Sequence, residues 1–243
     1  MSSPSLRIHD TAEELAQACG TYLLQELEET LKTQARAAIA ISGGSTPKAL
    51  FAFLAKADFN WPRIHFFWVD ERCVPPTDDQ SNFKMANEIL LEPARIPKSN
   101  VHRISGELSP EDAATGYIEE IRFFFSLKEG QLPAFDLLHR GMGPDAHTAS
   151  LFPGEPLIRD RTNIAAHVWV EKLKSHRVTL LPGVLLAAKQ TVLQVAGADK
   201  ADPARNVLEG PEDPMRYPCQ IASRDSVATW FLDRAAASKL QCG

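Results

Sequence analysis

The segment Ala37-Ala-Ile-Ala-Ile-Ser-Gly-Gly-Ser-Thr-Pro-Lys48 decides the class of fold. It begins with an apolar run that does not alternate with polar residues, which is typical of a strand covered on both faces. Two glycines and two hydroxyl residues follow, and the next seven residues, Ala49 to Ala55, have the composition of a helix. A buried strand that enters a helix through a glycine-rich turn indicates a parallel α/β sheet.

The same alternation continues along the chain. Because strands and helices alternate, the sequence predicts a Rossmann-like, mainly parallel sheet with helices on both faces. No linker, repeat or low-complexity tract interrupts residues 1–243, so we expect a single domain. Strands are expected at 37–42, 64–69, 135–138, 177–181, 191–196 and 227–232, and helices at 11–31, 49–55, 82–91, 113–125 and 198–208.

Composition excludes several classes of function. The chain carries 26 Lys and Arg against 31 Asp and Glu, with a formal net charge of −5, so we expect no nucleic-acid partner. No apolar run approaches the ~20 residues of a membrane span, so no membrane association is expected. A local cluster of cations and amides can still bind a phosphorylated metabolite in an acidic protein.

Cysteine usage and the start of the sequence indicate a cytoplasmic protein. Four cysteines, Cys19, Cys73, Cys219 and Cys242, lie far apart and have no ligand-like spacing. With no signal peptide at Met1-Ser-Ser-Pro, we expect reduced thiols in the cytoplasm. A thiol nucleophile is a minor alternative. We expect no metal and no cofactor, and either a monomer or a weak homodimer.

Four connections that follow predicted strands carry chemically useful side chains. In parallel sheets ligands bind beyond the carboxyl ends of the strands, so these connections are expected to converge. They are the loops 42–46, 70–72, 141–150 and 196–200, the last of which ends in Lys200.

The first of these loops has the chemistry of a phosphate cradle. Gly43 and Gly44 let the backbone approach an anion, Ser42 and Thr46 add hydroxyl donors, and free amides at the helix start complete the cradle. A tight turn with Thr46 as N-cap and Pro47 as the first helical residue is the alternative. The spacing of a Walker loop is absent.

The second loop, Asp70-Glu71-Arg72, contains charges at the mouth of a buried strand. Solvated loop residues are the ordinary interpretation of such charges. Arg72 is a candidate phosphate ligand, because a guanidinium matches phosphate in a bidentate way.

The third loop formally fits a dinucleotide fingerprint in Gly141-Met-Gly-Pro-Asp-Ala146. A dinucleotide unit needs a helix and a second strand before its acidic residue. Pro153 and Pro156 leave no room for both before Asp160, so nicotinamide and flavin binding are disfavoured.

Within this loop we predict that His147 is a general base supported by Asp145. Histidine titrates near neutrality, and only His147 of the seven histidines combines a glycine-rich loop with a near carboxylate. A histidine that caps the following segment is the alternative. The Gly-x-Ser-x-Gly elbow of serine esterases and the HExxH metal motif are both absent.

Six motifs in order resemble the 6-phosphogluconolactonase family, from about residue 10 to 238. They are Ile41-Ser-Gly-Gly-Ser-Thr-Pro, Val69-Asp-Glu-Arg-Cys-Val-Pro with Asp79-Gln-Ser-Asn82, Gly141-Met-Gly-Pro-Asp-Ala-His-Thr-Ala-Ser-Leu-Phe-Pro-Gly154, Arg177-Val-Thr, Gly197-Ala-Asp-Lys-Ala and Trp230-Phe-Leu-Asp-Arg-Ala-Ala.

The resemblance implies hydrolysis of 6-phospho-D-glucono-1,5-lactone to 6-phospho-D-gluconate in the oxidative pentose phosphate pathway. It also implies the fold of glucosamine-6-phosphate deaminases, with His147 as the base. By matching position, Gly43, Gly44 and Thr46 would meet the phosphate, joined by Arg72, Arg177 or Lys200. Ser42 and Asp70 are further candidates for substrate binding.

The chain departs from the family pattern at two places. Ala146 stands where glycine is usual, and it would be strained by ~1 kcal/mol or more if that position needs a positive φ. His139 and Arg140 replace apolar residues expected before Gly141.

Two rival functions follow from the same motifs. A sugar-phosphate deaminase or isomerase of this fold would carry a glutamate five residues after the histidine and a tyrosine at the position of Arg72. Phe152 and Arg72 stand there instead, which favours the lactonase. A non-catalytic sugar-phosphate-binding protein is the alternative from another class, encouraged only by Ala146.

Overall fold

A seven-stranded sheet forms the centre of the computed structural model, which describes residues 3–241. All of its neighbouring strands pair in parallel, as the sequence predicted. Its order is β1 (Ser5–His9), β10 (Ala228–Asp233), β9 (Thr191–Val195), β6 (Leu137–Arg140), β2 (Ala37–Ile41), β3 (Ile64–Trp68) and β5 (Val101–His102).

The chain reverses its direction across the sheet between β2 and β6. From β2 it proceeds through β3 to β5 at one edge, whereas from β6 it proceeds through β9 to β10 on the other side. β2 and β6 are direct neighbours, with Ile39 paired to Leu137. Loops that leave such strands on opposite faces open a crevice, and this switch point is where ligands bind in doubly wound sheets.

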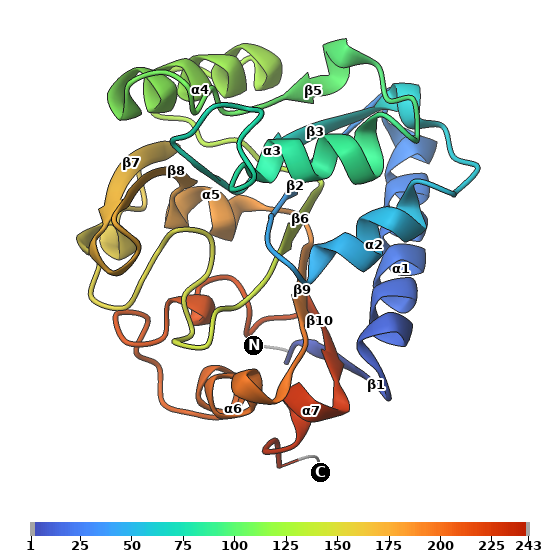
Figure 1. Cartoon of the computed structure of the whole chain (residues 1–243), viewed down its shortest axis with the longest axis vertical. Helices are drawn as coiled ribbons and strands as arrows, with labels where there is room; N and C mark the ends of the chain where they lie inside the picture. Colours follow the sequence, from blue (N-terminus) through green and yellow to red (C-terminus); the bar gives the residue numbers. More distant parts are fainter. Residues whose placement is uncertain (1–2, 242–243) are drawn as a thin grey trace.

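Helices cover both faces of the sheet, as predicted (Figure 1). Successive side chains of β3 demonstrate the two faces: the ring centroid of Phe67 lies 5.1 Å from that of Phe124 in one helix, and Trp68 lies 5.6 Å from Phe83 in another. The face of Trp68 carries α1 (Ala12–Thr33), α2 (Pro47–Leu54) and α3 (Asn82–Ala86). The face of Phe67 carries α4 (Pro110–Phe125), α6 (Ala201–Leu208) and α7 (Arg234–Ala237).

A second, three-stranded antiparallel sheet lies beside the first. Its order is β4 (Asp70–Arg72), β8 (Ser175–Leu180) and β7 (Ala165–Val170), followed by α5 (Pro182–Ala187). Val69 joins the two sheets, because its N–H donates to Ile41 and its carbonyl accepts from Leu180. The prediction of a loop at 70–72 was wrong: three charged residues have no strand pattern, and their pairing with β8 is a long-range contact.

The other element predictions differ from the structure mainly at their bounds. The helix expected at 82–91 is α3 followed by a π-helical turn at Asn87–Leu91, and the strand expected at 135–138 is Leu137–Arg140. Strands β1, β5 and β7 were not predicted. Within residues 3–241 no helix is both long enough and apolar enough to cross a membrane.

Candidate active site

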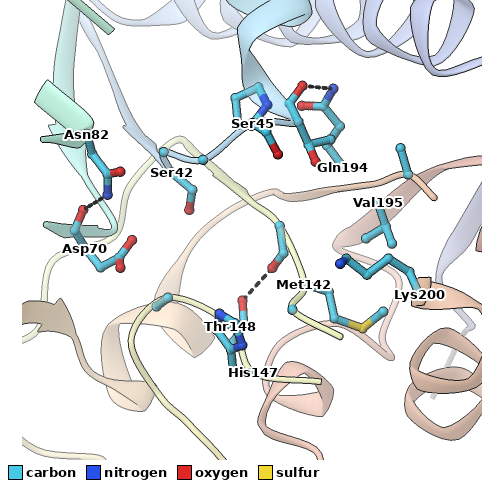
Figure 2. Close-up of a pocket in the computed structure, with 18 of the residues that line it drawn as sticks. Ser42, Ser45, Asp70, Asn82, Met142, His147, Thr148, Gln194, Val195 and Lys200 are labelled. Carbon is cyan, nitrogen blue, oxygen red and sulfur yellow. Dashed lines mark hydrogen bonds between the residues drawn. The ribbon is translucent and has the colours of Figure 1, made fainter. Parts of the chain in front are cut away.

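A cavity of about 260 Å³ opens at the switch point, beyond the carboxyl ends of β2, β3, β6 and β9 (Figure 2). All residues predicted for the site line it except Asp145, which bonds to His147 from outside; the roles of these residues remain predictions. The lining consists of residues 42–47, Asp70, Arg72, Asn82, 141–143, 147–149, Arg177, 194–196 and Lys200.

The glycine loop after β2 lies directly against Asn82. A Cβ on Gly43 would lie 1.8 Å from Oδ1 of Asn82, so only glycine permits this approach. Gly44 has a φ of +106°, a conformation that L side chains rarely adopt. Pro47 is the first residue of α2, but the side chain of Thr46 makes no capping bond. The capping role considered for Thr46 is therefore absent, and the hydroxyl of Ser42 also has no partner within the described chain.

Two arginines face each other across the antiparallel pair of β4 and β8. Arg72 is the register partner of Arg177, and the Nε atoms of both are buried without a hydrogen-bond partner among residues 3–241. Burial lowers the pKa of Arg177; the carboxylate of Asp70 opposes this shift, and the charge of Arg72 adds to it. Directly opposed like charges destabilise a sheet. An anion between them would remove that cost.

Asp70 and its neighbour Glu71 organise this wall of the cavity. Oδ2 of Asp70 accepts from the Ser150 hydroxyl at 2.6 Å and lies 3.7 Å from a guanidinium nitrogen of Arg177. Glu71 accepts backbone N–H groups of Asn82 and Phe83 at 2.8 and 2.7 Å, which fixes the start of α3. Burial raises the pKa of Glu71, and these hydrogen bonds oppose the shift.

His147 lines the cavity and is held by Asp145. Its Nδ1 lies 2.5 Å from Oδ1 of Asp145, and its ring stacks on Phe152 with centroids 4.2 Å apart. The other oxygen of Asp145 accepts from the ammonium of Lys172. Burial acts to raise the pKa of Asp145, but the hydrogen bonds from His147 and Lys172 outweigh it and hold the pKa well below its usual range. An ionised Asp145 fixes the proton of His147 on Nδ1 and leaves Nε2 as an acceptor.

The loop that presents His147 needs a glycine at position 143 and holds two alanines, Ala146 and Ala149, at positive φ. A Cβ on Gly143 would lie 1.9 Å from Nδ1 of His147, so the imidazole occupies the space that a side chain would take. Ala146 has a φ of +63°, which answers the question that the sequence left open. The left-handed conformation costs an alanine roughly 1 kcal/mol.

Lys200 reaches the cavity from the turn after β9. Gly197 starts this turn with a φ of +104°, and its N–H donates to the carboxylate of Asp233. The ammonium of Lys200 is paired with Asp199 at 2.5 Å, and its side chain is 17% exposed. Lys200 also lines the cavity, so an anion in the cavity can compete with Asp199 for its ammonium (Figure 2).

Sequence reasoning missed Lys172, Gln194 and Arg140. Lys172 is an exposed residue between β7 and β8, and nothing in its local sequence indicates the contact with Asp145. Gln194 carried a signal, because it is the one glutamine in the apolar strand β9. Arg140 was noted only as unusual; it is fully buried and donates to Thr148 at 3.1 Å and to the Ala222 carbonyl at 2.9 Å, which braces the loop after β6.

No three His, Cys, Asp or Glu side chains among the described residues are grouped to hold a metal ion. Cys19, Cys73 and Cys219 are free, whereas Cys242 lies outside the described residues. Burial raises the pKa of Cys73 to about 11 and that of Cys219 to about 11, so neither is an activated thiolate.

Fold and site together define a doubly wound α/β protein with a crevice lined by cations and a carboxylate-supported histidine. The family model described as glucosamine-6-phosphate isomerases/6-phosphogluconolactonase matches residues 10–230. A 6-phosphogluconolactonase of Nostoc is 37% identical over 221 residues, covering 90% of this chain and 90% of the relative. The chain belongs to the glucosamine-6-phosphate isomerase/6-phosphogluconolactonase family.

Solved structures agree with this assignment. The 6-phosphogluconolactonase of Trypanosoma brucei superimposes with a TM-score of 0.89 at 26% identity, covering 99% of this chain and 100% of that one. A monomeric glucosamine-6-phosphate deaminase has a TM-score of 0.79 at 19% identity, covering 97% of this chain and 100% of its own. The second likeness concerns the fold alone, and it agrees with the predicted deaminase-type fold.

Proposed function

We propose that this chain is a 6-phosphogluconolactonase, which hydrolyses 6-phospho-D-glucono-1,5-lactone to 6-phospho-D-gluconate in the oxidative pentose phosphate pathway. The observation that carries the proposal is the pairing of His147 with Asp145 in one cavity with Arg72 and Arg177. A base and a group of cations in one cavity suit a substrate that carries both a carbonyl and a phosphate.

In the proposed reaction Nε2 of His147 takes a proton from water as the water oxygen attacks C1 of the lactone. Asp145 stabilises the imidazolium that forms, because its carboxylate accepts from Nδ1 at 2.5 Å. The tetrahedral intermediate then collapses, the bond between C1 and the ring oxygen breaks, and Nε2 returns its proton to that oxygen. Histidine is a base at the start of the cycle and an acid at its end.

The phosphate is proposed to bind among the glycine loop and the cations. Ser42, Gly43, Gly44 and Thr46 offer hydroxyl and amide donors, and Arg72, Arg177 and Lys200 offer positive charge. Asp70 would orient Arg177. Binding energy from the phosphate, remote from C1, would hold the ring in line with the attacking water. Loop amides or Lys200 would stabilise the oxyanion.

A deaminase or isomerase on this fold is disfavoured by Phe152. The position that would need a titratable carboxylate holds a phenyl ring stacked on His147 at 4.2 Å. A non-catalytic sensor is disfavoured by the oriented His147–Asp145 pair, since mere binding needs no base.

The test is to generate the lactone enzymatically and follow its decay with the uncatalysed background subtracted. Accelerated decay supports the proposal, and ammonia release from glucosamine 6-phosphate would instead identify a deaminase. Binding of 6-phosphogluconate without accelerated decay would identify a sensor. We further propose a cytoplasmic monomer or weak homodimer, which light scattering across a concentration series and fractionation of cells would test.

A further inference from the structure

A buried polar pair lies at the cavity, and one of its members, His139, stands where an apolar residue is expected before Gly141. His139 of β6 is 0% exposed and Gln194 of β9 is 2% exposed, and the Nε2 of His139 lies 3.0 Å from the Oε1 of Gln194. Burial lowers the pKa of His139 to about 4, so the imidazole is neutral at physiological pH. Buried polar groups cost free energy unless they are bonded, so this pair needs an explanation.

The hydrogen bonds fix how the amide of Gln194 is oriented. Its nitrogen lies 3.4 Å from the carbonyl oxygen of Thr46, which only accepts, so the amide nitrogen faces Thr46 and the amide oxygen faces His139. His139 must then carry its proton on Nε2 to donate to that oxygen. Nδ1 of His139 is left as an acceptor without a partner among the described residues.

The bond from Gln194 to Thr46 crosses the switch point of the sheet. β9 belongs to the half of the sheet that continues from β6, whereas Thr46 follows β2 in the other half, and β6 lies between them. Figure 2 shows Gln194 beside Ser45, with a dashed bond that ties strand β9 to the glycine loop. Gln194 therefore links the glycine loop, through Thr46, to β6, through His139. β6 leads directly into the loop that carries Met142 and His147.

We propose that Gln194 is a positioning residue that sets the place of the glycine loop relative to the catalytic loop, and that His139 fixes the amide of Gln194 for this task. An apolar pair would fill the same space without needing hydrogen bonds, but it would remove the hydrogen bond that connects β9 to the Thr46 carbonyl in the glycine loop. The proposal rests on the proposed function for the identity of the phosphate-bearing ligand.

The experiment uses Gln194→Leu, His139→Leu and the double variant. Each single change leaves a buried polar group unpaired, so both should lower Tm, whereas the double variant, with neither polar partner, should recover most of it. The bond to Thr46 is absent in Gln194→Leu and in the double variant, and in His139→Leu the amide of Gln194 loses the partner that orients it. We expect KM for the lactone and Kd for 6-phosphogluconate to rise about 10-fold in each, with kcat within about twofold.

Tyr22→Phe is the matched control. Tyr22 and Thr229 form a buried hydrogen bond of 3.3 Å between α1 and β10, and neither residue lines the cavity. This variant should lower Tm without changing KM or Kd. A double variant that recovers both Tm and wild-type Kd would overturn the proposal, as would single variants with unchanged Kd. Titration with 6-phosphogluconate by calorimetry needs no turnover, so failure of the lactonase assignment shows separately as an inactive wild-type protein.

Discussion

Arg72 of β4 lies directly opposite Arg177 of β8, and the guanidinium Nε atoms of both are buried without a partner within the described chain. Asp70 lies 3.7 Å from Arg177 and partly offsets its charge, whereas the charge of Arg72 opposes it. This arrangement is unfavourable for the empty protein and favourable once a dianion enters. In the proposed function, a phosphate bound here would recover the free energy lost in the sheet as binding energy.

Replacing Arg72 by Met should separate binding from stability. The variant removes one of two opposed charges, so its Tm should equal or exceed that of the wild type. Loss of about 2 kcal/mol of charge-assisted hydrogen bonding should raise KM about 30-fold. Steady-state kinetics measure KM. Thermal unfolding, without inorganic phosphate and with it at a concentration of roughly 10 to 100 times its Kd, measures Tm. Arg103→Met is the control, because Arg103 pairs with Glu107 outside the cavity; an unchanged KM for Arg72→Met would refute the role of Arg72.

Removing the imidazole of His147 should abolish most of the turnover. A positioned general base contributes roughly 10²- to 10⁴-fold, so His147→Ala should lower kcat by about that factor while binding 6-phosphogluconate like the wild type. Asp145→Asn should also lower kcat, because the amide no longer fixes the proton on Nδ1 of His147. His176→Ala, a change at an exposed histidine of β8, is the control. Full activity in His147→Ala would remove His147 from the mechanism.

The sequence predicted the parallel sheet from β2 outward because local patterns carry that information. Apolar runs without alternation mark buried strands, and the glycine turn after Ile41 marks a strand-to-helix crossing. Candidate residues on four separate loops were expected to converge because parallel strands bring their carboxyl ends to one edge. The cavity lining contains residues from each of those loops.

The sequence did not predict contacts that depend on distant partners. β4 forms only because Asp70–Arg72 meets β8 a hundred residues later in the chain, as its register with Thr179 and Arg177 shows. Lys172 reaches Asp145 from an exposed turn, and no local pattern marks such a contact. Whether Ala146 adopts a positive φ depends on how the loop packs, so it required coordinates.

The lowered pKa of Asp145 predicts how its contribution to stability varies with pH. Asp145 binds a proton less readily in the folded state than in the unfolded state. The stability that this carboxylate contributes is therefore fully present above its ordinary pKa of about 3.9. It is lost as the pH falls toward the lower pKa of the folded state. The Tm of the wild type minus that of Asp145→Asn should therefore be constant from about pH 7 to 5 and shrink below about pH 4. Calorimetric scans across that range measure it, and a difference that does not change down to pH 2 contradicts the ion pairing of Asp145.

Exchange of glycine and alanine should have a large effect at Gly143 and a small one at Ala146. In Gly143→Ala the new Cβ would meet the imidazole at 1.9 Å, so His147 must leave Asp145 and kcat should fall at least about 100-fold. In Ala146→Gly the relief of left-handed strain stabilises the folded state by about 1 kcal/mol. The loss of a methyl group from a residue that is only 1% exposed destabilises it by about 0.8 kcal/mol. The added freedom of glycine in the unfolded chain also destabilises the folded state. These effects nearly cancel, so the free energy of unfolding should change by less than about 1 kcal/mol and kcat by less than about twofold. Denaturant unfolding and initial rates of both variants provide the measurement. A large gain of activity in Ala146→Gly would mean that the alanine distorts the loop, and an active Gly143→Ala would mean that the imidazole works from another position.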